Sequence, residues 1–142
     1  MNQVKRYLNT AVVYAVTAMA CGVFYREFTK YLGFTGDTNL SVMHTHYFLL
    51  GMVFFLILAL MEKSFSFSGQ KGTGKIAAAY HIGLNLTGVM LFARGLLQAL
   101  RSEVNEGLDA AVSGLAGFGH ILLGISMILF LLRLRKATEG TN

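Results

Sequence analysis

Four long apolar stretches, separated by short polar segments, are the feature that most constrains how this chain can fold. They cover about residues 7–25, 41–61, 76–100 and 113–132. A helix that crosses the roughly 30 Å hydrocarbon core of a bilayer needs about 20 mainly apolar residues, and each stretch is of that order. None of them alternates polar and apolar residues as a half-buried strand does. We therefore predict an all-α membrane protein, an up-and-down four-transmembrane-helix bundle that forms a single domain over residues 1–142.

The composition agrees with this class. Charged residues make up 13% of the chain and hydrophobic residues 54%, whereas soluble domains have about 25% and 45–50%. A chain with so many hydrophobic and so few charged residues is not expected to be disordered. It has one cysteine, Cys21, which excludes a scaffold held together by disulfide bonds. Ala18-Met19-Ala20 before Cys21 loosely resembles a lipoprotein cleavage site. We favour a buried thiol in a transmembrane helix, which is the commoner fate of a free cysteine.

Lysine and arginine predict the orientation of the bundle. Eight of them fall on one side of the predicted membrane, before the first span, between the second and third, and after the fourth: Lys5, Arg6, Lys63, Lys71, Lys75, Arg133, Arg135 and Lys136. Positive residues concentrate on the cytoplasmic side, so we expect both termini to be cytoplasmic in a multi-pass protein of the bacterial cytoplasmic membrane. The net charge of +5 is thus a topology signal, and we expect the lipid bilayer, not nucleic acid, as the surrounding partner.

Ionisable side chains inside the spans are the candidates for function, because they are costly in a membrane. All four histidines lie in predicted spans: His44, His46, His81 and His120. With a rise of about 1.5 Å per residue, His46 and His120 lie about 8 and 10 Å from the outer ends of their spans, and Arg94 about 9 Å from the outer end of the third. We expect these three side chains at one depth, in the outer half of the membrane.

Two histidines from different helices at one depth are the ligand set of a bis-histidine haem. Gly117 and Gly124 lie on the His120 face and would leave room beside the ligand for the macrocycle. Arg94 is suited to a haem propionate, because arginine pairs well with carboxylates. We therefore expect a non-covalent haem b whose iron is held by His46 and His120. Gly117, Gly124 and Arg94 would complete the site. Six-coordinate iron favours electron transfer, with a quinone or a membrane redox protein as partner. No separate catalytic constellation is evident, so whether the protein is an enzyme stays open.

His44 lies about 200° around the helix from His46, so the two cannot serve one iron. The segment from Met43 to Met52, MHTHYFLLGM, resembles the tenth helix of haem-copper oxidase subunit I. In that family a His-x-His pair followed by an aromatic residue binds two haems from opposite faces of one helix. The resemblance implies that His46 is a low-spin haem ligand and His44 a candidate ligand at a second site. It covers about ten residues, and the copper ligands and tyrosine motif of the oxidase are missing, so oxygen reduction is not implied.

Other readings stay open. The whole chain resembles a family of short bacterial four-helix membrane proteins of unassigned function. One alternative is a copper- or zinc-binding membrane protein that uses Met43, His44 and His46, with or without His120. Another is a cofactor-free accessory or scaffold subunit, and a homo-oligomer is compatible with either. His81 lies near the cytoplasmic end of its span, about 20 Å from Arg94. We interpret it as a helix-packing histidine or a second site.

Overall fold

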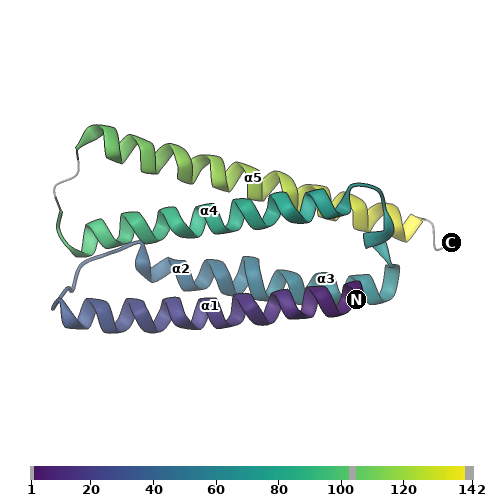
Figure 1. Cartoon of the computed structure of the whole chain (residues 1–142), viewed down its shortest axis with the longest axis horizontal. Coiled ribbons are helices and arrows are strands. Elements are labelled where there is room, and N and C mark those ends of the chain that lie inside the picture. The colour runs from purple at the N-terminus through teal and green to yellow at the C-terminus, as the bar shows by residue number, and fades with distance from the viewer. Residues whose placement is uncertain (1, 103–104, 140–142) are drawn as a thin grey trace.

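The computed structural model describes residues 2–102 and 105–139, in which four long helical segments run alternately up and down (Figure 1). The first is α1 (Gln3–Tyr31). The second consists of α2 (Leu40–His46), η1 (Tyr47–Val53) and α3 (Phe54–Phe65), followed by a 3-10 turn, η2 (Phe67–Gly69). The last two are α4 (Thr73–Ala99) and α5 (Glu106–Glu139). Each segment is long and apolar enough to cross a membrane, so the prediction of an all-α, four-helix, multi-pass membrane protein is supported.

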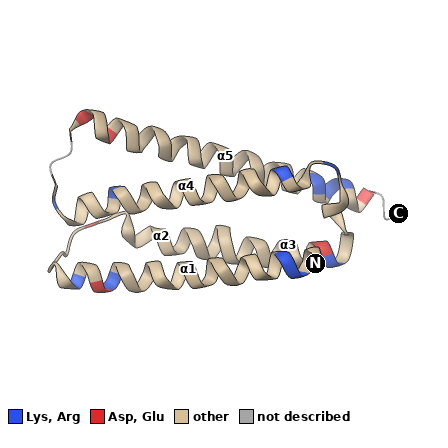
Figure 2. Ribbon diagram, viewed as in Figure 1, with Lys and Arg blue, Asp and Glu red and all other residues tan. Residues whose placement is uncertain are grey.

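The segments form two antiparallel pairs that lie one over the other (Figure 1). In one pair α1 runs along the α2–η1–α3 segment, and in the other α4 runs along α5. The pairs meet where α2 packs on α4 and where α3 reaches α5. The described chain begins and ends at the same end of the bundle, at residues 2 and 139; this end carries most of the lysines and arginines and is called the basic end (Figure 2). The opposite end, with the two connections after α1 and α4, is called the far end.

Both long helices that end at the far end stop in the same kind of turn. Gly33 has a φ of +61° and Arg101 a φ of +51°, the left-handed conformation that commonly follows a helix. In each case the next amide N–H bonds five residues back, from Phe34 to the carbonyl of Thr29 and from Ser102 to that of Leu97. These are the bonds of a Schellman motif, which satisfies carbonyls at a helix end.

The second segment is interrupted by a π-helix over residues 47–53, directly after His46. π-helical turns are rare, and those inside α-helices are frequently found at functional sites. Within this stretch the Tyr80 hydroxyl of α4 donates a 2.7 Å hydrogen bond to the Leu50 carbonyl. The π-helix therefore sits against a buried tyrosine of the neighbouring helix pair.

Glycines allow two close approaches between helices. A Cβ on Gly83 of α4 would lie 2.6 Å from the Leu123 amide nitrogen and 3.0 Å from the Gly119 carbonyl oxygen of α5. A Cβ on Gly51 would lie 2.6 Å from the Cβ of Tyr14 on α1. Small residues bring transmembrane helices this close, so these glycines set the spacing of α4 against α5 and of η1 against α1.

Candidate functional site

The two histidines predicted to share a ligand site come together in the structure. His46, the last residue of α2, and His120 of α5 lie close together, with ring centres 6.1 Å apart and ring planes at 87°. They come from different helix pairs and are separated by 74 positions in the chain, so the fold alone brings them together. The expectation that they lie at one depth in the bundle is met.

Each of these imidazoles is held by its own helix. The Nδ1 of His46 lies 2.9 Å from the Val42 carbonyl oxygen, and the Nδ1 of His120 lies 2.8 Å from that of Ala116. A carbonyl oxygen only accepts, so Nδ1 carries the proton in both rings. In the neutral rings Nε2 then has a free lone pair. A histidine that binds a metal almost always donates its other N–H in this way.

The face of α5 around His120 is open. A Cβ placed on Gly117 or on Gly124 would meet no heavy atom within 4 Å. His120 itself is exposed at the surface of the protein, and His46 is half-buried. The protein atoms thus leave space beside His120 along its helix, on both the basic-end and far-end sides.

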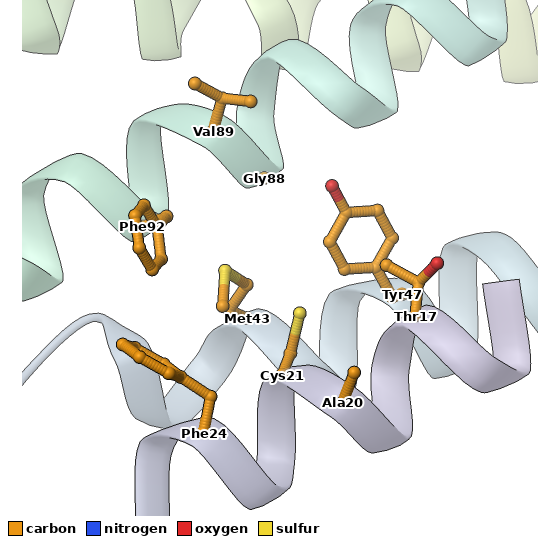
Figure 3. A pocket seen from close by; sticks show the side chains of 9 residues that line it. All are labelled: Thr17, Ala20, Cys21, Phe24, Met43, Tyr47, Gly88, Val89 and Phe92. Carbon is orange, nitrogen blue, oxygen red and sulfur yellow. The ribbon is translucent and has the colours of Figure 1, made fainter. Parts of the chain in front are cut away.

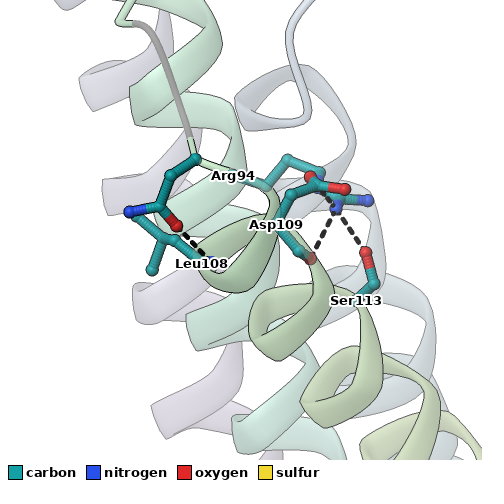
Figure 4. A network of polar contacts seen from close by, with 5 residues as sticks. Arg94, Leu108, Asp109 and Ser113 are labelled. Carbon is teal, nitrogen blue, oxygen red and sulfur yellow. Dashed lines mark hydrogen bonds and ion pairs between the residues drawn. The ribbon is translucent and has the colours of Figure 1, made fainter.

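Arg94 is found farther toward the far end than the histidine pair. Its Nη2 donates to the Asp109 carboxylate at 2.7 Å and to the Ser113 hydroxyl at 2.6 Å (Figure 4). Ser113 is seven residues from His120, which is about 10 Å along α5. All hydrogen bonds from Arg94 to described residues use Nη2, which leaves its Nη1 and Nε for another partner. The Arg94 side chain therefore lies nearer the far end than the His pair, and the expectation that all three side chains share one depth does not hold for Arg94.

His44 points to a different neighbour, as its angle to His46 predicts. A Cβ on Gly22 of α1 would lie 3.7 Å from the Cβ and Cγ of His44, in ordinary contact. The Nδ1 of His44 is buried and has no hydrogen-bond partner in the described part of the chain. Nothing in these contacts assigns it a ligand, so its role as a second site stays a prediction.

His81 belongs to a polar network that the sequence did not reveal. Its Nδ1 lies 2.6 Å from the hydroxyl of Tyr14 on α1. The Asn85 side chain donates to the same hydroxyl at 3.0 Å, and its Oδ1 accepts a 3.4 Å hydrogen bond from the Tyr47 hydroxyl. Tyr14 and Tyr47 look like ordinary aromatic residues of apolar spans, and only the polar Asn85 and His81 signal such a network.

Metal ions bound by protein side chains alone need more ligands than this site offers. Over residues 2–102 and 105–139, no group of three or more His, Cys, Asp and Glu side chains is placed to hold an ion. The paired histidines could therefore offer a metal two protein ligands, not three or four.

Comparison with known proteins gives one match. A family model described as "Protein of unknown function (DUF2871)" matches residues 4–137. Neither a search of curated proteins nor a search of solved structures returns a significant match.

Proposed function

The chain belongs to the DUF2871 family, and from the histidine pair of this member we propose that it is a haem b-binding membrane protein with His46 and His120 as the iron ligands. When bound, the haem would supply a one-electron redox centre. The residues of this chain would hold the iron from two helices, orient the macrocycle and exclude water.

The spacing of the two imidazoles is the observation that carries the proposal. A bond from an imidazole nitrogen to a metal is about 2.0 Å long, and the ring centre lies about 1.1 Å behind that nitrogen. Two imidazoles on opposite sides of one metal therefore have centres about 6.2 Å apart. The observed 6.1 Å matches this value, and the protonated Nδ1 of each ring leaves Nε2 as the ligand atom.

A haem suits this pair better than a free metal ion. Structural zinc takes four protein ligands and catalytic zinc three, and copper(II) prefers four donors in a plane. Haem iron needs only axial protein ligands, since the macrocycle supplies the other four. The open face at Gly117 and Gly124 leaves room for a planar group, and Arg94 has unused N–H donors for a propionate.

The expected role is electron transfer within the bacterial cytoplasmic membrane. Two protein ligands on the iron leave no position for a substrate, which favours an electron carrier over a catalyst. The positive-inside rule then puts the basic end, with both termini, in the cytoplasm. By that orientation the histidine pair lies in the outer half of the bundle.

An absorption spectrum of the purified protein tests the proposal. We expect sharp α and β bands after reduction and one haem per chain by pyridine haemochrome. His46→Ala and His120→Ala are each expected to remove these bands. His81→Gln, which removes a histidine outside the site, should keep them. A protein without haem bands, or bands that survive both alanine substitutions, would overturn the proposal.

Elemental analysis of the same samples separates the alternatives. Copper or zinc bound without haem would favour the metal-binding protein. A folded protein that stays colourless and metal-free, even with haem supplied during expression, would favour an accessory subunit without a cofactor.

A further inference from the structure

A second site candidate lies between α1 and α4, on the side of the bundle where the His81 network is found. There the protein leaves a cavity of about 400 Å³. It opens at the surface, since Asn9 and Asn85 on its wall are both exposed. Six of its residues have polar side chains without a formal charge: Asn9, Thr10, Tyr14, Thr17, His81 and Asn85.

The deepest of these polar groups lie near the middle of the membrane-spanning segments. Tyr14 is 11 residues from the start of α1 and Asn85 is 12 residues from the start of α4, or about 17 and 18 Å along the helices. Polar groups that face hydrocarbon at that depth are costly unless they are hydrogen-bonded. The Asn85 amide is bonded to the Tyr14 hydroxyl, the His81 carbonyl and the Tyr47 hydroxyl, so a ligand would gain its hydrogen bonds from the other polar groups of the cavity. Asn9 and the Nε2 of His81 have no hydrogen-bond partner among the described residues, so both are available to it.

An apolar cavity of about 330 Å³ adjoins the polar one (Figure 3). Thr17 lines both. From there the apolar cavity runs toward the far end between α1, α2 and α4, past Cys21, Met43 and Phe92. The Tyr47 ring lines this cavity, while its hydroxyl bonds to Asn85 of the polar one. The two cavities are thus neighbours that share Thr17 and meet at the Tyr47–Asn85 hydrogen bond, and we call them together the path, polar in its first part and apolar in its second.

We propose that this path binds a membrane quinone, with the ring in the polar cavity and the prenyl tail in the apolar one. A quinone has two ring oxygens that accept hydrogen bonds, no charge, and a long apolar tail. A cavity of this size is typical for small ligands. A phospholipid could pair its phosphate with Arg6, which also lines the polar cavity, but it fits less well, because a charged phosphate stays at the membrane surface and does not reach Tyr14 and Asn85. The choice of a redox-active amphiphile rests on the proposed haem function.

A second copy of the chain is the other candidate occupant, and the shape of the site disfavours it. A helix with its side chains is about 10–12 Å wide. The polar groups line a concavity between two helices, where a partner helix would contact the rim and leave Tyr14 and His81 uncovered.

Photolabelling of the purified, full-length protein in nanodiscs tests the proposal. The probe is an azido-ubiquinone, and labelled residues are located by peptide mass spectrometry. We expect labelling of residues 9–17 and 81–92, with competition by decylubiquinone. Thr10→Phe fills the polar cavity and should lower labelling about tenfold, the change expected for a loss of about 1.4 kcal/mol in binding. Thr45→Phe is the matched control, since Thr45 lies on α2 and bonds only to the Val42 carbonyl.

Several results would overturn the quinone site. Labelling spread evenly over lipid-facing residues would do so, as would displacement by phosphatidylglycerol but not by decylubiquinone. Efficient disulfide cross-linking of a Thr10→Cys variant into dimers would assign the face to a second copy. If Thr10→Phe does not fold, Asn9→Leu takes its place, with a monodisperse elution profile as the criterion for folding.

The same samples separate this inference from the haem proposal. Haem bands without specific labelling would overturn the quinone site alone. Specific labelling of a protein that binds no haem would overturn the haem proposal and leave the cavity as a quinone site.

Discussion

The contact between α4 and α5 at Gly83 predicts how far a single methyl group displaces the proposed ligand His120. In Gly83→Ala the new Cβ would lie 2.6 Å from the Leu123 amide nitrogen and 3.0 Å from the Gly119 carbonyl oxygen. Both are backbone atoms of α5, so no side chain can rotate away. Ordinary contact requires about 3.5 Å, and α5 must therefore move by about 1 Å. His120 follows Gly119 in the chain and would move with it.

Two measurements follow from this displacement. Overpacking a tight contact costs about 1–3 kcal/mol, which should appear as a lower free energy of unfolding in an SDS titration. Metal–ligand distances tolerate only about 0.2 Å, so a 1 Å shift of His120 should convert part of the haem to a five-coordinate form. That form gives a high-spin electron paramagnetic resonance signal and binds carbon monoxide.

Gly114→Ala is the matched control, because a Cβ at Gly114, on α5, meets nothing within 4 Å. It should leave both the stability and the spectrum close to wild type. If Gly83→Ala behaves like this control in both measurements, α4 and α5 are not in backbone contact at this point and the reasoning is refuted.

Three further outcomes are expected. Gly117→Leu should lower the haem content, because the new side chain blocks the space beside His120. Gly114→Leu should not, because position 114 lies about 120° from His120 around α5; equal haem content in the two variants would contradict the argument from the open face. Tyr14→Phe removes two hydrogen bonds and should lower the free energy of unfolding by about 1–2 kcal/mol, measured by SDS titration; no change would mean that the network is not formed. Asp109→Asn should change the free energy of unfolding by less than about 1 kcal/mol, because Asp109 is exposed and its partner Arg94 is only half-buried; a larger loss in thermal unfolding would place this pair in a water-poor environment.

The lengths of the apolar stretches predicted the four helices, because a bilayer demands that length. The helices extend past the predicted boundaries, α5 from Glu106 to Glu139 instead of 113–132. The polar residues of the terminal turns carry no apolar signal, so counting apolar residues misses them. Asp109, which precedes the predicted span 113–132, is thus in the first turn of α5 and within reach of Arg94.

The common depth of His46 and His120 was predictable because it follows from counting residues along the spans. Which helices are neighbours does not follow from such counting, so the structure was needed to show that the two rings meet. The hydrogen bond between Tyr14 and His81 joins residues 67 positions apart, and no sequence pattern around either residue indicates the other as its partner. The π-helix after His46 was also not predicted, since its residues are the same apolar types as those of an α-helix.

The π-helical stretch over residues 47–53 divides the second span into two halves that contact different neighbouring helices. An α-helix turns by about 100° per residue, and a π turn accommodates one residue more than an α turn. Deleting one residue in this stretch would let it revert to a regular α-helix and swivel one half by about a quarter turn or more against the other. The half that presents His46 to α5 and the half that presents Phe55 to Tyr14 could then not both keep their partners. Insertions and deletions should thus be tolerated far less in this apolar run than in the connections at either end.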